Sequence, residues 1–199
     1  MPRKLENFLP RILPWCLGAP EPLVYQALID SASQFCEEST VIHYITDPVT
    51  VIPKVSEYEI DLPPQCDLAR VMKVFFSTGP YDIYTSQPVN WQLTDLTTLK
   101  IYPVPQQELP EGQFMFFDVA TKPSHNATVL DDKLYTDWIE GVAGGAIFRL
   151  CSTPDQPYTN PNNAAIGLAA FKTWRGKAQY DCVKHRVKRD TGVRMRPFA

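Results

Sequence analysis

The distribution of proline constrains the fold of this chain more than any other feature of its sequence. Of the 19 prolines, 18 occur at or before Pro161, and only Pro197 follows. Proline has no backbone N–H and clashes with the preceding helical turn, so it interrupts helices and central strands. The first two-thirds of the chain must therefore fold from short elements, whereas the end after Pro161 can form a long helix.

Two segments show helical periodicity. The first contains Pro22, a residue favoured in the first turn of a helix, and we expect it to end near Glu38. The second begins at the pair Asn160–Pro161, which suits a helix start, and should run toward Val187. Its apolar and small residues recur every three or four positions, so they predict one packing face. This predicted face consists of Gly167, Phe171, Trp174, Ala178 and Cys182, followed by His185.

A third helical stretch should begin at Asp131 or Asp132, with Leu134, Trp138 and Phe148 on one stripe. It contains three glycines, at positions 141, 144 and 145, and each weakens an isolated helix by about 1 kcal/mol relative to alanine. Two interpretations stay open: the glycines allow close contact with another helix, or the helix breaks there.

Between residues 39 and 126 the periodicity changes to two, which is typical of strands. The clearest case is Glu57–Leu62, where Tyr58, Ile60 and Leu62 alternate with acidic residues. Prolines and glycines separate this segment from the other candidates, as expected of short antiparallel strands. The other strand candidates are residues 40–45, 49–52, 70–76, 81–85, 99–102 and 113–119.

These patterns predict an α+β fold in which a small helical bundle carries an inserted antiparallel β-sandwich or barrel. The bundle should comprise residues 21–38 and 127–190, and the insertion residues 39–126. Residues 191–199 read as an extended C-terminal tail. Residues 1–20 are apolar but proline-punctuated, so we interpret them as an extended arm that covers the chain's own core or a neighbouring subunit.

The charge is strongly asymmetric along the chain. Residues 172–199 contain nine basic and two acidic residues, for a formal charge of +7, whereas residues 1–171 carry −10. A segment this polarised usually binds a partner, although a solvated end is the simpler alternative. The basic end could also bind nucleic acid, with Tyr180 and Phe198 stacking on bases, but the acidic pI of about 5.6 disfavours a general nucleic-acid module.

No residue pattern indicates catalysis, a metal site or a cofactor. His43, His125 and His185 have no companions at metal-ligand spacing, and the five cysteines include no C-x-x-C pair. Neither a phosphate-binding glycine loop nor a nucleophile elbow is present. We therefore expect a protein that is not an enzyme, with reduced thiols. Because no apolar run approaches the ~18 residues of a membrane helix, we also expect a soluble protein made in the cytoplasm.

Two regions of the chain resemble the head-to-tail adaptor, or connector, proteins of tailed bacteriophages. The first is the helix-to-strand passage Ala27–Thr40, followed by the alternating stretch Glu57–Pro63. The second is the C-terminal helix, Asn160–Phe171, which continues through Arg175–Ala178 into a basic tail that contains Gly192. Together with the order of the elements, these regions cover most of the chain.

The resemblance implies a structural protein of the virion neck. Such adaptors form a ring, usually twelve-fold, between the portal and the tail, extend the channel through which genomic DNA passes without sequence-specific binding, and offer a platform to downstream tail proteins. In relatives the C-terminal tail inserts into the portal. The residues that match this role are Lys184, Arg186, Lys188, Arg189, Arg194, Arg196 and Phe198. The alternatives are a tail-completion or baseplate component, or a nucleic-acid-binding module.

Overall fold

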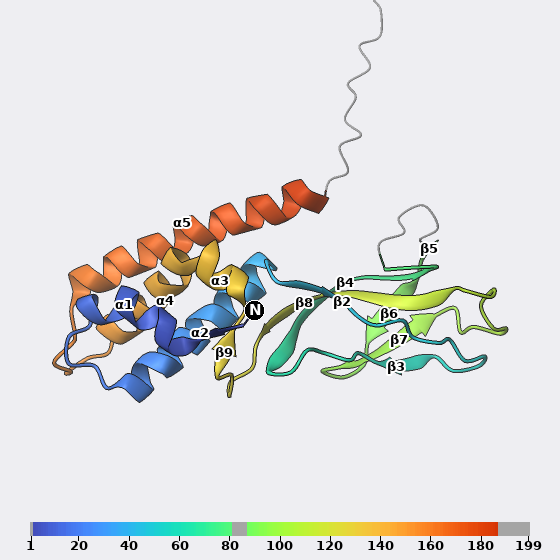
Figure 1. Ribbon diagram of the computed structural model, residues 1–199, viewed down its shortest axis with the longest axis horizontal. Helices are drawn as coiled ribbons and strands as arrows, with labels where there is room; N and C mark the ends of the chain where they lie inside the picture. Colours follow the sequence, from blue (N-terminus) through green and yellow to red (C-terminus); the bar gives the residue numbers. More distant parts are fainter. Residues whose placement is uncertain (1, 81–86, 187–199) are drawn as a thin grey trace, which may run out of the picture.

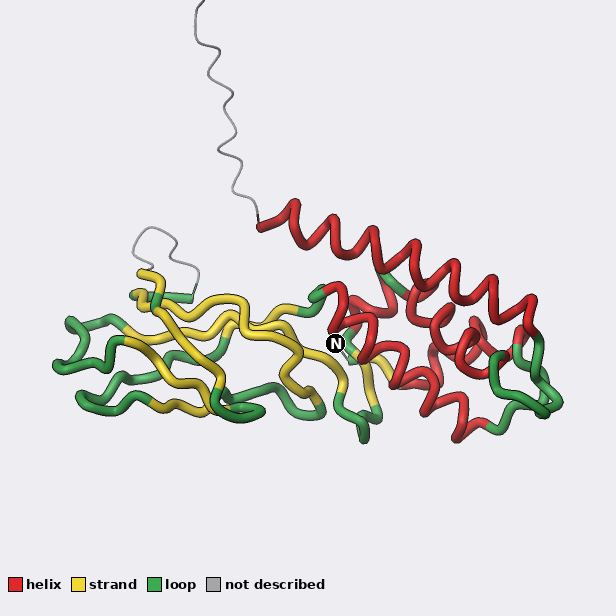
Figure 2. Tube along the Cα trace, turned by 180° about the vertical axis from the view of Figure 1, so that it is seen from behind, coloured by secondary structure: helices red, strands yellow, loops and turns green. Residues whose placement is uncertain are grey.

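The computed structural model describes residues 2–80 and 87–186 of the chain, and these form an elongated molecule with helices in one half and sheets in the other (Figure 1, Figure 2). The predicted mixed α+β class with antiparallel sheets is confirmed. Each half has its own cluster of buried apolar side chains. The strand candidate 81–85 and the predicted tail 191–199 lie outside the described residues.

The N-terminal segment is mostly helical and packs on the chain's own core, so the prediction of an extended arm was wrong. Its elements are β1 (Arg3–Lys4), η1 (Leu5–Phe8), α1 (Leu9–Ile12) and η2 (Leu13–Trp15). Pro10 and Pro14 fall in the first turns of α1 and η2, where a helix has no internal partner for the N–H that proline lacks. Phe8, Ile12 and Cys16 are fully buried in the helical core.

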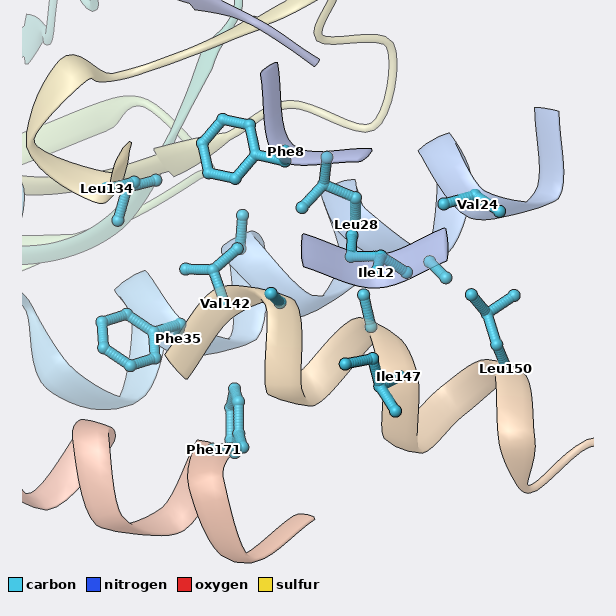
Figure 3. Close-up of a cluster of buried hydrophobic side chains, with 14 of the residues drawn as sticks. Phe8, Ile12, Val24, Leu28, Phe35, Leu134, Val142, Ile147, Leu150 and Phe171 are labelled. Carbon is cyan, nitrogen blue, oxygen red and sulfur yellow. The ribbon is translucent and has the colours of Figure 1, made fainter. Parts of the chain in front are cut away.

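Four longer elements complete the helical half: α2 (Glu21–Ser39), α3 (Asp132–Thr136), α4 (Ile139–Cys151) and α5 (Pro161–Arg186). Helix α4 lies in the middle, and side chains from α1, α2 and α5 converge on it, among them Ile12, Phe35 and Phe171 (Figure 3). Helix α2 ends where Thr40 takes a left-handed conformation and donates its N–H to the Cys36 carbonyl over 2.7 Å.

The third predicted helix is two helices, because the helical conformation is interrupted at Asp137 and Trp138. Asp131, one of the two residues predicted to cap this helix, caps α3 by accepting a 2.8 Å hydrogen bond from the backbone N–H of Lys133. Residues 127–131 lie within the bounds predicted for the bundle but precede its helix. They include β9 (Val129–Leu130), which pairs with β1, and the extended backbone at Asp131 lets this residue cap a helix that starts at residue 132, as predicted.

The β half consists of two antiparallel sheets that share one core. Its strands are β2 (His43–Ile45), β3 (Glu57–Glu59), β4 (Cys66–Ser77), β5 (Gln87–Pro88), β6 (Asn90–Leu93), β7 (Thr98–Tyr102) and β8 (Phe114–Pro123). One sheet has the order β2-β8-β4-β5 and the other β3-β7-β6. The predicted strand 49–52 is only an isolated bridge from Val49 to Met115, because Pro48 and Pro53 leave little room for a ladder.

Alternation in the segment that contains β3 follows the predicted period of two. Tyr58 and Ile60 are buried, whereas Glu57 and Glu59 are exposed. Strand β3 lies at the edge of its sheet, where charged side chains discourage pairing with other chains. The two halves meet at the far end of β8, where Lys122 forms an ion pair with Glu37 of α2 at 3.3 Å.

Candidate functional site

Helix α5 is the element that carries the basic end of the chain, so the way it is held decides how that end is presented. Its backbone touches the backbone of α4 at Gly167 and Gly144. A Cβ atom built on Gly167 would lie 2.6 Å from the Gly144 carbonyl oxygen, and one built on Gly144 would lie 2.8 Å from the Gly167 oxygen. Only residues without a side chain allow this approach. The glycines of α4 therefore serve close contact, and α4 does not break there.

The middle of α5 is anchored by aromatic contacts. The ring of Phe171 meets the ring of Phe35 of α2 edge-on, with centroids 5.9 Å apart. One turn later, Trp174 meets Trp138 with centroids 6.3 Å apart, again edge-on. Such pairs contribute about 0.5–1.5 kcal/mol beyond the area that they bury. Phe171 is buried and Trp174 is half-buried, so both lie on the face that the sequence predicted.

The C-terminal half of α5 is held by polar contacts with the end of α2. Arg175 forms an ion pair with Glu38, and the Gln179 side chain donates a 2.8 Å hydrogen bond to the Glu38 carbonyl. Ala178 is fully buried, and the Cys182 thiol lies 3.5 Å from the Thr40 carbonyl oxygen. All five residues of the predicted packing face therefore point toward the helical core, although Cys182 is only partly covered.

The predicted portal-binding residues fall mostly beyond the part of the chain that the structure describes. Lys184 is exposed near the end of α5. Arg186 is the last residue of that helix, but its side chain is outside the described set. Lys188, Arg189, Arg194, Arg196 and Phe198 also lie outside the described residues.

Other lysines of α5 are exposed away from the packing face. Lys172 is one, and Lys177 is another, with its ammonium nitrogen 4.1 Å from the centroid of the Trp174 ring. A cation over an indole face gains about 0.5–1 kcal/mol at an exposed site and is held in a defined direction. With Lys184, these side chains flank the outward face of α5 on its two sides, while residues 1–171 carry a net negative charge. Positive charges placed in this way can attract and orient an acidic surface.

The two histidines whose side chains the structure describes have different neighbours. Nδ1 of His43 lies 3.4 Å from an Asp118 carboxylate oxygen, and Nδ1 of His125 lies 3.2 Å from the side-chain nitrogen of Gln26. The side chain of His185 is outside the described set. Within residues 2–80 and 87–186, no group of three or more His, Cys, Asp or Glu side chains could hold a metal ion. Nor does any helix in that part of the chain have the length and apolarity needed to cross a bilayer.

The structure brings together one pair of thiols that sequence reasoning missed. The sulfur atoms of Cys16 and Cys151 are 3.3 Å apart, and both side chains are fully buried. Burial raises the pKa of the Cys16 thiol to about 12, so little of it is the reactive thiolate at neutral pH. The two residues are 135 positions apart, and no local spacing signals such a pair.

Two hollows in the β half were also missed. One, of about 340 Å³, lies beside the junction of the two halves and is lined in part by Tyr44, Cys66 and Leu134. The other, of about 270 Å³, lies between residues 50–53 and residues 108–114. No local sequence pattern indicates either hollow, because each is lined by segments far apart along the chain. The second carries two carboxylates, Glu108 and Glu111, beside apolar side chains.

Comparison with known proteins assigns the chain to no family: no protein-family model matches it, and no curated protein is significantly similar to it.

Proposed function

We propose that this chain is a structural virion protein, a head-to-tail adaptor that forms a ring between the portal and the tail and extends the DNA channel. The proposal rests on one observation above all: the basic end of the chain begins on a helix that the acidic body holds rigidly. Contacts at Gly167, Phe171, Trp174 and Cys182 fix α5 along most of its length. The backbone positions that carry the exposed lysines of α5 are therefore fixed relative to the body.

A rigid helix that ends in a basic segment suits docking into another protein. The formal charge of residues 172–199 is +7, and a partner with acidic side chains would be attracted and oriented by it. In the proposed adaptor the C-terminal tail reaches the portal, with Arg186 and the basic residues beyond it making the contact. The rest of the ring offers a platform to the downstream tail proteins. A twelve-fold ring in the virion neck, with DNA sliding through it, follows from the family resemblance.

The test is deletion of residues 187–199, which removes the basic tail but leaves every described helix and strand intact. We expect a chain with unchanged far-ultraviolet circular dichroism and unchanged melting temperature that no longer associates with portal-bearing heads. A matched control keeps the length and replaces Arg194 and Arg196 with glutamine. This control should show intermediate binding. If the truncated chain still joined heads as the full chain does, the docking role would be wrong.

The exposed lysines also favour a second candidate, a nucleic-acid-binding module. Phosphate contacts through Lys172, Lys177 and Lys184 would make affinity fall steeply with salt, by roughly one power of the salt concentration per contact. We expect the adaptor to bind double-stranded DNA only weakly at physiological salt. Tight binding with a steep salt dependence in a filter or fluorescence assay would favour the nucleic-acid function instead.

A further inference from the structure

The outward face of α5 is unusual for a surface helix. Its residues at three- and four-residue steps are uncharged, and they lie opposite the packing face: Ile166, Ala169, Thr173, Gly176, Tyr180 and Val183. Tyr180 is 67% exposed, Val183 58% and Ile166 53%. A helix at the surface of a globular protein normally turns charged and polar residues to water. Helix α5 instead has apolar residues on two opposite faces, and exposed apolar residues on the outward one indicate that a partner covers that face.

Gly176 supports this reading. It lies within α5, where glycine costs about 1 kcal/mol relative to alanine. At positions 141, 144, 145 and 167 this loss of stability is offset, because glycine there allows close contacts inside the molecule. A Cβ atom on Gly176 would meet nothing within 4 Å, so no contact within the described chain requires this glycine. A glycine at position 176 would, however, be required if another molecule approached the backbone of α5 closely at this point.

The β half offers a surface that is complementary to this face. The 270 Å³ groove between residues 50–53 and 108–114 is lined by apolar side chains and by two carboxylates, and no basic residue lines it. The contributing side chains include Val51, Ile52, Leu109, Phe114, Glu108 and Glu111. Ile52 is 56% exposed. The groove therefore suits an apolar knob that is flanked by positive charges.

Tyr180 is such a knob. Lys177 lies one turn before it and Lys184 one turn after it, and both are exposed. Residues 50–53 and 108–114, which line the groove, lie in the β half, whereas α5 lies in the helical half (Figure 1), so the two surfaces can be engaged at the same time by different neighbours. The lysines on α5 would repel the same face of another copy, which disfavours a symmetric pairing of α5 with α5. Contact between two different surfaces builds a ring when the rotation from one copy to the next closes.

We propose that α5 of one copy packs on the β half of the next, with Tyr180 in the groove of the neighbour and Lys177 and Lys184 near Glu108 and Glu111. The occupant of this surface is therefore a second copy of this chain. This inference rests on the proposed ring and names the contact that would build it.

The first test places a photo-crosslinking amino acid at Tyr180 in the full chain, with the same substitution at Leu17 as the matched control. Leu17 is 76% exposed but lies outside the proposed contact. Irradiation should link Tyr180 variants into dimers and larger species whose joined peptides contain residues 50–53 or 108–114. The Leu17 variant should give no such link. Native mass spectrometry of the same samples, and of assembled particles, reports independently whether a ring exists.

Rings without a Tyr180 link to those segments would overturn this inference and leave the proposed function standing. Links from Tyr180 to another virion protein alone would assign the face to that protein and overturn it too. The absence of oligomers both from purified protein and from particles that contain the chain would contradict the proposed function itself.

Charge reversal gives a second, independent test. Lys184→Glu alone and Glu111→Lys alone should each weaken assembly by roughly tenfold, because each brings like charges together across the contact. The double variant should recover assembly to near that of the unchanged chain. Both residues are exposed, so melting temperatures should not change. A double variant that assembles no better than either single variant would overturn the proposed pairing.

Discussion

The cores of the two halves of the molecule are packed in different ways. In the helical half, the backbones of α4 and α5 touch at Gly144 and Gly167, so the core depends on the absence of side chains. In the β half, two sheets face each other through large side chains such as Phe117 and Leu99. A backbone atom cannot rotate away from an added group, whereas a side chain can adjust its rotamer. The contact between α4 and α5 should therefore tolerate gain of volume least.

Their outer surfaces differ as well. The edge strand β3 is protected by Glu57 and Glu59, as is usual for a strand that must not pair with another chain. The outward face of α5 is uncharged along its middle, where Tyr180 and Val183 are exposed. The edge of β3 is therefore protected against association with other chains, whereas the outward face of α5 is suited to it. This contrast is the reason to assign the interface to α5.

The largest effect should come from loss of volume in the β half. Phe117 of β8 is fully buried between the sheets, so Phe117→Ala should lower the free energy of unfolding by about 4 kcal/mol. Urea denaturation followed by circular dichroism measures this. If the helical circular dichroism signal and the amide NMR signals of β-half residues such as Trp91 of β6 are lost at different urea concentrations, the halves unfold separately. Coincident transitions would show that β8 couples them.

Gain of volume in the helical half should cost about 2 kcal/mol. Gly167→Ala places a methyl group against two backbone atoms of α4, the Gly144 oxygen and the Phe148 nitrogen, which cannot move independently. Gly176→Ala is the matched control on the same helix. It meets nothing within 4 Å and should stabilise the monomer by up to about 1 kcal/mol. Equal effects of the two changes in urea denaturation would refute the close contact between α4 and α5.

Each half also contains a buried side-chain hydrogen bond, and its loss should have a smaller effect on the free energy of unfolding. In the β half, the Thr46 hydroxyl accepts a 3.1 Å hydrogen bond from the Phe117 N–H, so Thr46→Val leaves a buried donor unpaired and should cost about 2 kcal/mol. In the helical half, the Ser31 hydroxyl donates to the Val142 carbonyl over 2.7 Å. Ser31→Ala should cost only about 1 kcal/mol, because that carbonyl lies within α4. The reverse order of the two unfolding free energies would contradict this account.

The smallest effect concerns an exposed ion pair at the N-terminus. The Arg3 guanidinium donates a hydrogen bond to the Asp132 carboxylate and holds the pKa of that carboxyl below its ordinary value. A depressed pKa means that the pair stabilises the fold above the ordinary carboxyl pKa and is lost as the pH falls through the depressed value. Arg3→Ala should therefore raise the pKa of Asp132 in an NMR titration. An unchanged pKa would show that the pair is absent in solution.

Much of the fold was accessible from local periodicity. The packing face of α5 could be predicted because helical spacing alone brings Gly167, Phe171 and Ala178 to one side. The alternation around Tyr58 likewise predicted which side chains are buried. The N-terminal segment was misjudged, because prolines in first turns of short helices look the same in a sequence as prolines in an extended arm.

The candidate interface was accessible only in part. The basic residues of α5, among them Lys184, follow from composition. The groove that faces them in the proposal does not, since its walls come from residues 50–53 and 108–114, which no local pattern connects. The role of Gly176 also needed the structure. In the sequence it resembles the other helical glycines, and only the empty space around it sets it apart.

The sequence by itself determined that helical regions flank a β-region, which face of α5 is buried and where positive charge is concentrated, because these depend on neighbouring residues and on simple counts. The tertiary structure decided which of those elements contact one another. The backbone contact of α4 with α5, the pairing of Cys16 with Cys151 and the groove in the β half all join segments distant along the chain. Such contacts depend on the packing of the whole molecule, which local periodicity does not encode.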